Sequence, residues 1–189
     1  AGKTTTFNML TGVYVPTEGE ITFNGQSIKG LKPYQVSHKG ISRTFQNIRL
    51  FKDLTVLDNV KIANHQLAKH SILSSILRLP THFKGEATME KESIEFLKIF
   101  ELDVYKDELA KNLPYGMQRR LEIARALAAG PKLLLLDEPA AGMNPQETQE
   151  LMDLIALIRK EFDLTILLIE HDMSLVMGIC ERIYVLDHG

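Results

Sequence analysis

The sequence contains little of several features that would each point to a particular class of protein. Its 189 residues include one cysteine, Cys180, and no tryptophan. A single cysteine excludes an internal disulfide framework and agrees with a reducing compartment. The 24 acidic and 22 basic residues give a formal net charge of −2, so the chain as a whole lacks the basic field that favours nucleic acid. The longest apolar runs, such as LTILLI, are far shorter than the ~20 residues that a membrane span requires.

Apolar residues make up 44% of the chain, which is enough for one domain with a sizeable core. The chain does not begin with methionine, and it stops at Gly189 soon after a strand-like run. We therefore expect an internal fragment of a longer protein.

The first fifty residues predict one helix and two strands. Gly2–Leu10 has the pattern of a short helix that Gly12 ends. Gly19–Gly25 (GEITFNG) alternates apolar and polar residues and finishes with Asn-Gly, which predicts an exposed antiparallel strand followed by a tight turn. Gly40–Gln46 (GISRTFQ) predicts another strand.

The pattern is helical over residues 54–113, where apolar residues recur with helical spacing among mixed charges. Thr55 and Asp58 have the spacing of a capping box and predict the start of a helix over 56–67. A second helix is predicted over 89–100. We interpret this region as a helical subdomain.

The following part of the chain predicts helices and strands in alternation. The strands are near-continuous apolar runs, which predicts a parallel sheet covered on both faces. Ligands of such sheets bind at the carboxyl ends of the strands, and Asp137, Glu138 and His171 all sit at predicted strand ends. The predicted helices are Gly116–Ala129, Gln146–Phe162 and Met173–Cys180, and the predicted strands are Lys132–Asp137, Leu164–Glu170 and Arg182–Leu186.

The first four residues, AGKT, match the last part of the phosphate-binding loop G-x-x-x-x-G-K-[ST] at the start of a predicted helix. Gly2 lets backbone amides approach a phosphate, Lys3 can reach the β- and γ-phosphates, and the Thr4 hydroxyl can bind Mg²⁺. Gly-Lys-Thr alone is a weak signal, and a capped helix start with a surface lysine explains it equally well. The first glycine of the motif and its preceding strand are absent from the sequence, so only half of the motif can be tested.

The stretch LLLLDEP, residues 133–139, predicts a buried strand that ends in two adjacent carboxylates. Unpaired carboxylates are costly at the edge of a core, so either a cation accompanies them or the strand end is solvated. A strand of four apolar residues that ends in aspartate matches the acidic motif of phosphate-loop NTPases, where Asp137 would hold Mg²⁺. Glu138 would then polarise a water for in-line attack on a γ-phosphate.

Five motifs in order give the chain a specific resemblance. They are Gly-Lys-Thr, Gln46 after a strand, the segment LPYGMQRRLEIARAL, the stretch LLLLDEP, and His171 in LLIEHD. Together they resemble the ATP-binding subunit of ATP-binding-cassette (ABC) transporters over essentially the whole chain. The resemblance implies an α/β fold: a RecA-like P-loop NTPase core with a mainly parallel sheet, an antiparallel β edge and an α-helical subdomain. The core would comprise residues 1–50 and 130–189, and the helical subdomain, which ends in the signature motif and its helix, would comprise residues 51–129.

The resemblance also implies roles for individual residues, with ATP and Mg²⁺ as cofactors. Glu138 would be the general base, His171 would contact the γ-phosphate, and Gln46 would sense Mg²⁺ and the attacking water. The signature loop would reach the ATP of a partner subunit across a dimer interface. The implied ATP ligands are Gly2, Lys3, Thr4, Thr5, Leu113, Tyr115 and Gly116, and the implied Mg²⁺ ligands are Thr4, Gln46 and Asp137.

Two departures from the family pattern matter. The signature Leu-Ser-Gly-Gly-Gln is here LPYGM, so Pro114 lacks the serine hydroxyl that in the family contacts the partner's ATP. Losing one hydrogen bond to a charged group would cost about 1.5–3 kcal/mol of dimer closure, which predicts weaker ATP-driven dimerisation. The usual Ala-Leu-Asp loop is here Gly142-Met143-Asn144, and Asn144 keeps hydrogen-bonding capacity without charge.

Several segments, among them TFQNIRLFKDLTVLDNV and DEPAAGMNP, resemble one branch of the family: the ATP-binding subunits of high-affinity branched-chain amino-acid importers. That branch implies transmembrane permease subunits, a second ATP-binding subunit in a heterodimer or homodimer, and indirectly a substrate-binding protein, with no nucleic acid. The chain would lie at the cytoplasmic face of the plasma membrane. Importers of urea or short amides and the lipopolysaccharide-export ATPase have similar cassettes and stay open as alternatives.

The sequence leaves other interpretations open as well. The chain could be a soluble ABC ATPase that acts on DNA or ribosomes, or a non-catalytic cassette with a degraded signature. The apolar face of the helix over 56–67 could pack inside the helical subdomain, or it could line a groove that receives a permease helix. Its members are Val56, Leu57, Val60, Ile62, Ala63 and Leu67.

Overall fold

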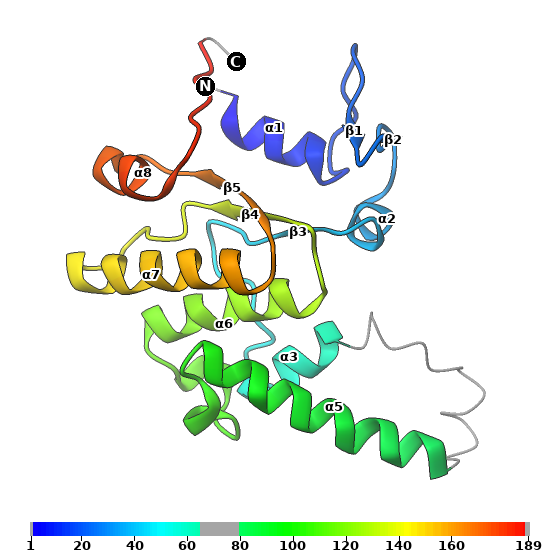
Figure 1. The fold of residues 1–189 in the computed structure, drawn as a ribbon, viewed down its shortest axis with the longest axis vertical. Helices are drawn as coiled ribbons and strands as arrows, with labels where there is room; N and C mark the ends of the chain where they lie inside the picture. The colour runs from blue at the N-terminus through cyan, green and yellow to red at the C-terminus, as the bar shows by residue number, and fades with distance from the viewer. Residues whose placement is uncertain (1, 65–79, 188–189) are drawn as a thin grey trace. The chain divides into compact units, whose positions relative to one another are not determined.

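The computed structural model describes residues 2–64 and 80–187, which form two compact units (Figure 1). The first unit, Ala1–Gln46 with Pro131–Gly189, contains the described strands, and the second, Asn47–Gly130, is helical. No helix of the described ranges is long and apolar enough to span a lipid bilayer.

A three-stranded parallel sheet forms the centre of the first unit and confirms the predicted parallel arrangement. Its middle strand begins with four leucines and is buried over its last four residues, because it is the central strand and helices lie on both faces of the sheet (Figure 1). In register, Leu135 of this strand pairs with Arg43 on one side and Leu167 on the other. The strands in spatial order are β3 (Ile41–Arg43), β4 (Leu133–Asp137) and β5 (Thr165–Ile169).

Helices cover both faces of this sheet, and Figure 1 shows α1 (Lys3–Leu10) on one side and α7 (Pro145–Glu161) on the other. α1 begins after Gly2, whose φ of 90° lies in the left-handed region that suits glycine. It ends before Gly12, where an added Cβ would lie 2.3 Å from the Leu31 carbonyl oxygen. The predicted helix end at a glycine is therefore confirmed. α2 (Pro33–His38) and α8 (Met173–Ile179) complete the helices of the unit, whose core contains Phe7, Ile28, Val36, Ile41, Leu135 and Ile169.

A small antiparallel pair is separate from the parallel sheet: β1 (Thr22–Phe23) pairs with β2 (Gln26–Ser27). Asn24 and Gly25 have φ values of 48° and 74°, so they form the tight Asn-Gly turn. The predicted antiparallel strand is confirmed, although its ladder covers only two residues of Gly19–Gly25.

The predicted strand over Arg182–Leu186 is wrong. The segment has no regular secondary structure, and Tyr184 and Val185 are largely exposed. Its apolar residues gave a strand-like pattern, but a strand needs a neighbour to complete its hydrogen-bond ladder. Within the described ranges, no strand pairs with this segment.

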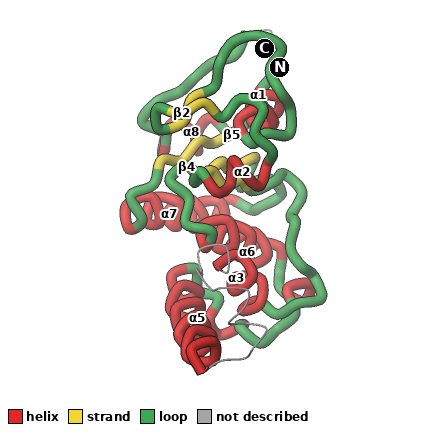
Figure 2. Tube along the Cα trace, turned by 90° about the vertical axis from the view of Figure 1, so that its right-hand side faces the viewer, coloured by secondary structure: helices red, strands yellow, loops and turns green. Residues whose placement is uncertain are grey.

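The helical unit is built from α3 (Val56–Asn64), α5 (Pro80–Ile99) and α6 (Tyr115–Ala128), which pack against one another (Figure 2). α3 begins where the sequence predicts. Thr55 Oγ1 accepts a hydrogen bond from the Asp58 amide (3.0 Å) and donates one to the Asp58 carboxylate (2.8 Å). Two short 3-10 turns, η1 (Asp103–Tyr105) and η2 (Ala110–Asn112), lie between α5 and α6.

The apolar face of α3 is used mostly for packing inside its own unit. Of the six predicted face residues, Ile62 is 40% exposed and Leu67 lies outside the described residues. The packing interpretation therefore holds for the four that are buried. These four are Val56, Leu57, Val60 and Ala63.

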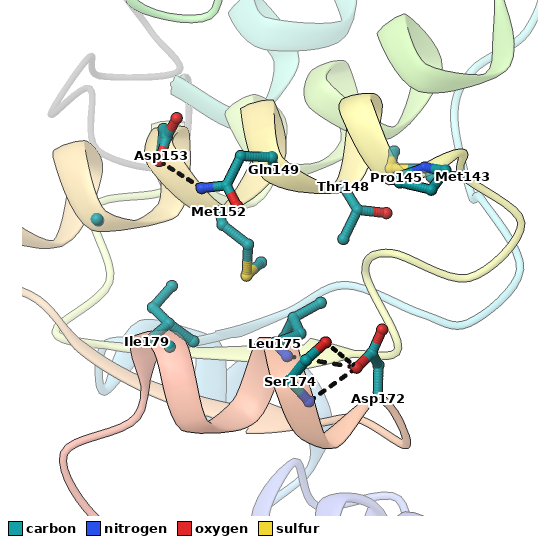
Figure 3. A pocket seen from close by; sticks show the side chains of 12 residues that line it. Met143, Pro145, Thr148, Gln149, Met152, Asp153, Asp172, Ser174, Leu175 and Ile179 are labelled. Atoms are coloured by element: carbon teal, nitrogen blue, oxygen red, sulfur yellow. Dashed lines mark hydrogen bonds between the residues drawn. The ribbon is translucent and has the colours of Figure 1, made fainter.

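A surface cavity opens between α7 and α8 of the first unit (Figure 3). Met152, Leu175 and Ile179 supply apolar lining, and Asp172 also lines it. The Asp172 carboxylate accepts hydrogen bonds from the Ser174 amide (2.9 Å) and hydroxyl (2.5 Å), so it caps α8. None of the described lining residues is a predicted site residue, and the cavity lies outside the site described below.

Candidate active site

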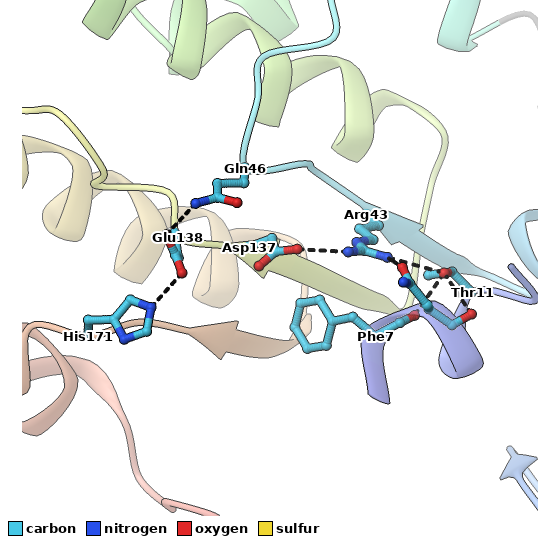
Figure 4. A network of polar contacts seen from close by, with 8 residues as sticks. Phe7, Thr11, Arg43, Gln46, Asp137, Glu138 and His171 are labelled. Atoms are coloured by element: carbon cyan, nitrogen blue, oxygen red, sulfur yellow. Dashed lines mark hydrogen bonds and ion pairs between the residues drawn. The ribbon is translucent and has the colours of Figure 1, made fainter. Parts of the chain in front are cut away.

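The carboxyl ends of the parallel strands bring three predicted site residues together (Figure 4). Gln46 lies three residues after β3, Glu138 directly after β4, and His171 two residues after β5. Parallel strands end at the same edge of a sheet, so residues that are distant in sequence become neighbours there.

Hydrogen bonds join these side chains into one series that starts at Lys3. Gln46 Nε2 donates to Glu138 Oε2 (2.9 Å), and His171 Nε2 lies 2.5 Å from Glu138 Oε1. Lys3 Nζ lies 3.4 Å from Nδ1 of the same ring. An ammonium group only donates, so Nδ1 accepts, and in the neutral ring Nε2 then carries the hydrogen that it donates to Glu138. Both carboxylate oxygens of Glu138 are therefore held.

The backbone of Glu138 adopts a conformation that is uncommon for a residue other than glycine. Its φ is 48°, in the left-handed region, where such a residue costs on the order of 1–3 kcal/mol. The Glu138 amide donates to the Ile169 carbonyl (2.9 Å), which anchors this turn to the end of β5. The strained turn thus places the carboxylate between Gln46 and His171.

Glu170 is a site residue that the sequence motifs do not single out. One of its carboxylate oxygens accepts from the Ala140 amide (3.1 Å) and the other from the His171 amide (3.2 Å). It therefore ties the loop that carries Glu138 to the loop that carries His171. A signal was present in LLIEHD, because an acid directly before the histidine sits at the same strand end.

Arg43, at the end of β3, is a second such residue. Its Nη2 donates to Asp137 Oδ2 (2.7 Å), and each of the two side chains is 6% exposed. Its Nη1 donates to Asn8 Oδ1 of α1 (2.7 Å). The cation that accompanies Asp137 in this structure is therefore Arg43, and a solvated strand end does not describe the Asp137 carboxylate.

The predicted phosphate ligands lie in the first turn of α1. The Gly2 carbonyl accepts hydrogen bonds from the Thr6 amide (2.8 Å) and the Thr6 hydroxyl (3.0 Å). The side chains of Lys3, Thr4 and Thr5 are exposed. Amides at a helix start lack partners within the helix, and the helix dipole is positive there, so this end suits a phosphate.

The predicted Mg²⁺ ligands are oxygen donors, which is the chemistry that Mg²⁺ requires. Asp137 supplies a carboxylate and Thr4 a hydroxyl, although the structure does not bring these two into hydrogen-bond contact. No three His, Cys, Asp or Glu side chains group into a metal site within the described ranges. Mg²⁺ beside phosphates is usually bound through one or two carboxylates plus phosphate and water oxygens, so the donors fit. Gln46, the third predicted ligand, bonds to Glu138.

The predicted signature residues lie in the second unit, at the start of α6. Pro114 is the N-cap residue and provides no side-chain cap, and Tyr115 is 46% exposed. The Leu113 side chain is buried, and its carbonyl accepts from Gln118 Nε2 (2.8 Å). Gly116 is half-buried in the first turn. The Leu113 side chain is therefore covered by the protein, whereas the Tyr115 side chain is open to solvent.

Asn144 has a structural role in the first unit. Its side chain accepts from the Glu147 amide (2.9 Å), and the Glu147 carboxylate accepts from the Asn144 amide (3.0 Å). The two residues form a capping box at the start of α7. The hydrogen-bonding capacity that the sequence indicates at Asn144 is thus used within the chain.

Comparison with known proteins places this chain in a family. Residues 1–141 match the sequence family described as "ABC transporter". The chain belongs to the ABC transporter family. It is 48% identical to the high-affinity branched-chain amino acid transport ATP-binding protein LivG of Escherichia coli (strain K12), over 100% of this chain and 74% of that protein. It is 45% identical, over the same shares, to the high-affinity branched-chain amino acid transport ATP-binding protein BraF of Pseudomonas aeruginosa.

The fold of this chain matches a solved structure of the ABC transporter family. The crystal structure of MJ1267, an ATP-binding cassette of an ABC transporter in its ADP conformation, matches with a TM-score of 0.75 at 31% identity. The match covers 94% of this chain and 69% of that one. The predicted P-loop NTPase core with a parallel sheet, an antiparallel pair and helices is confirmed, and the ABC chain is an ATPase of that type.

Proposed function

We propose that this ABC ATPase is the ATP-hydrolysing subunit of an importer whose cargo is branched-chain amino acids. The observation that carries the proposal is the position of Glu138, which has one carboxylate oxygen on Gln46 and the other on His171. The names of the LivG and BraF relatives support the cargo.

ATP would bind with its phosphates at the start of α1. The amides that follow Gly2 and the Lys3 ammonium group attract negative charge, and Thr4 and Thr5 add hydroxyl groups. Lys3 lies 3.4 Å from His171, so a γ-phosphate that reaches one of them also reaches the other. The phosphate would thereby sit beside Glu138.

Glu138 would act as the general base. As the oxygen of a water attacks the γ-phosphorus in line, the proton passes to the Glu138 carboxylate and the bond from phosphorus to the ADP oxygen breaks. Gln46 and His171 hold the carboxylate in place. A positioned base of this kind contributes about 10²–10⁴-fold to a rate.

Thr4, Gln46 and Asp137 would hold the Mg²⁺ that accompanies ATP. When bound, Mg²⁺ neutralises charge on the β- and γ-phosphates. Asp137 and Glu138 are adjacent in the chain, so the end of β4 places the carboxylate that would bind the metal next to the general base.

The active assembly would be a dimer of ATP-binding subunits on a pair of permeases. The partner's signature loop, equivalent to Leu113, Tyr115 and Gly116, would close on the ATP, and the closure would be passed to the permeases. A second ATP-binding subunit, either a related chain or another copy, completes this arrangement. The subunit would lie on the cytoplasmic face of the plasma membrane and receive cargo from a separate binding protein.

The substitution Glu138→Gln in the full-length natural protein tests the hydrolysis step. Glutamine keeps most of the volume and removes the base, so we expect phosphate release to fall at least about 100-fold. ATP-dependent dimerisation, followed by light scattering, should persist. Glu161→Gln, on an exposed glutamate at the end of α7, is the matched control and should retain the wild-type rate. A Glu138→Gln variant as active as the control would exclude Glu138 as the base.

Uptake of labelled leucine tests the cargo. Cells that lack the gene should regain uptake when they carry the wild-type gene and should not regain it with Glu138→Gln. Unchanged leucine uptake in the deletion strain would overturn the cargo and leave the ATPase assignment standing.

A further inference from the structure

Arg43 neutralises Asp137 in the structure. The distance from Nη2 to Oδ2 is 2.7 Å, and only 6% of either side chain is exposed (Figure 4). A buried carboxylate needs such a partner, because burial removes its hydration. Asp137 is also the carboxylate proposed to hold Mg²⁺, so one carboxylate has two candidate cations.

Arg43 has further contacts besides this ion pair. Its Nη1 donates to Asn8 Oδ1 (2.7 Å) and lies 3.5 Å from Thr11 Oγ1, both in or just after α1. The guanidinium carbon lies over the rings of Phe7 and Phe45, at 5.4 and 5.0 Å from their centroids. These contacts keep the cation in place when the state of its carboxylate partner changes.

The ion pair uses one carboxylate oxygen. Oδ2 of Asp137 accepts from Arg43, and Arg43 Nε has no hydrogen-bond partner within the described residues. A bidentate pair would have used a second guanidinium nitrogen and the second oxygen as well. The end-on geometry leaves the carboxylate able to engage a second cation.

We infer that Arg43 is an internal counter-cation of Asp137 that lowers the affinity of the site for Mg²⁺. The inference rests on the proposed function, because it takes Asp137 as a Mg²⁺ ligand. Arg43 stabilises the metal-free carboxylate, and it repels the metal once the metal is bound, since charges interact strongly where little water reaches. Both effects lower the affinity of the site for Mg²⁺. Arg43 is thus a positioning residue that holds the carboxylate in place without the metal and favours release of the metal with the product.

The test is a Mg²⁺ titration of nucleotide binding in the full-length natural protein. The probe is the fluorescent nucleotide mant-ADP at fixed concentration, and the readout is the Mg²⁺ concentration at half-maximal fluorescence change. Arg43→Met removes the charge and keeps an unbranched side chain against the two rings. We expect the midpoint to fall by about tenfold, because the competing charge is gone. An unchanged or higher midpoint would overturn the inference.

Two controls identify the source of the effect. Asp137→Asn removes the carboxylate and leaves only the direct repulsion between Arg43 and the metal, so Arg43→Met added to Asp137→Asn should lower the midpoint by less than it does in the wild type. Arg159→Met removes an arginine from an exposed ion pair with Glu181 in the same unit and should keep the wild-type midpoint. If the midpoint falls equally in Arg159→Met, the effect comes from the net charge of the protein, and the specific role inferred for Arg43 is wrong.

Loss of the fold and failure of the proposed function give different results. Thermal unfolding reports whether Arg43→Met is folded. If it is not, Arg43→Gln, which keeps an N–H donor for Asn8, takes its place with the same expected direction. Wild-type mant-ADP binding that does not respond to Mg²⁺ would contradict the proposed function. A wild-type response with an equal midpoint in the variant would contradict only the inference about Arg43.

Discussion

Arg119 and Glu122 form an ion pair inside α6 that solvent hardly reaches: Nη1 and Oε2 are 2.7 Å apart, and 0% and 1% of the two side chains are exposed. The other carboxylate oxygen of Glu122 accepts from the Arg49 amide (3.1 Å). Glu122 therefore links the first residues of the helical unit to α6.

Loss of one partner of this pair should destabilise the helical unit strongly. Arg119→Met removes the ion-pair partner of the buried Glu122 carboxylate, and breaking a buried pair from one side costs about 3–5 kcal/mol. Urea unfolding measures this loss as a free energy. Lys111→Met is the control, because both side chains of its ion pair with Asp53 are exposed. This control change should cost below about 1 kcal/mol. Equal losses in the two variants would contradict the role of burial.

His171→Ala and Gln46→Ala should each slow hydrolysis, because each releases one oxygen of Glu138. We expect kcat to fall about 10- to 100-fold in each, as small misplacements of a reacting group are costly. In a Glu138→Gln background each change should lower the residual rate by less than it lowers the wild-type rate, because the part of its effect that acts through the Glu138 carboxylate is already lost. Additive losses there would mean that these side chains act on the phosphate independently of Glu138. Phosphate release is the measurement.

The acids at the end of β4 and the histidine after β5 could be predicted, because each lies just after an apolar run in the sequence. LLLLDEP gives both an apolar run and two acids, and parallel pairing places Asp137, Glu138 and His171 at one edge. Arg43 could not be found in this way, and LLIEHD indicated that Glu170 lies at a strand end but not which groups it contacts. Arg43 reaches Asp137 across 94 positions and Glu170 reaches Ala140 across 30, and only the strand register creates these contacts.

Apolar patterns in the sequence also fail to predict structure where a hydrogen-bond partner from another segment is required. Helical spacing predicted the buried face of α3 but did not single out Asn59, which is fully buried. The Asn59 side-chain oxygen Oδ1 accepts from the Phe51 N–H (3.0 Å), and its Nδ2 donates to the Phe51 carbonyl (3.0 Å). A loop therefore supplies the polar partners that burial requires. The strand-like run Arg182–Leu186 has an apolar pattern but no described ladder partner, and it stays irregular.

Asn144→Ala should destabilise the protein through α7. The change removes the side-chain acceptor for the Glu147 amide, and loss of an N-cap costs about 0.5–2 kcal/mol. Asn144→Asp is the matched control, since aspartate caps as well as asparagine does and also restores the charge usual in the family. Thermal unfolding separates the two. A stable Asn144→Ala variant with impaired dimerisation would instead support a role across the dimer interface.

Asp172 should make part of the stability depend on pH. Hydrogen bonds from the Ser174 hydroxyl, and then from the Leu175 and Ser174 amides, hold the pKa of Asp172 below its ordinary value of 3.8. A carboxylate with a lowered folded-state pKa contributes stability above its unfolded pKa and loses it as the pH falls through the folded pKa.

Asp172→Asn tests this dependence, because asparagine also caps a helix and does not titrate. Urea unfolding over a range of pH should show wild type losing stability relative to Asp172→Asn below about pH 4, the region where an ordinary aspartate titrates. A constant difference between the two proteins through that range would contradict the prediction.

Pro114→Ser should tighten the ATP-dependent dimer. Pro114 is the N-cap of α6 and provides neither a hydroxyl nor an amide hydrogen, whereas serine adds both. A new hydrogen bond to a phosphate across the interface would contribute about 1.5–3 kcal/mol, or at least a tenfold lower dimer dissociation constant. Analytical ultracentrifugation of the hydrolysis-deficient Glu138→Gln background with ATP measures that constant.

Serine at position 114 also introduces a competing effect within one subunit. A serine N-cap stabilises α6 itself by about 1 kcal/mol, and that gain would raise the thermal stability of the monomer without ATP. Pro114→Ala restores the amide hydrogen but not the hydroxyl, so it separates the two contributions. Tighter dimers with serine and not with alanine would locate the effect in the hydroxyl. If serine raises the unfolding temperature and leaves the dimer constant unchanged, its hydroxyl caps the helix and does not reach the partner's ATP.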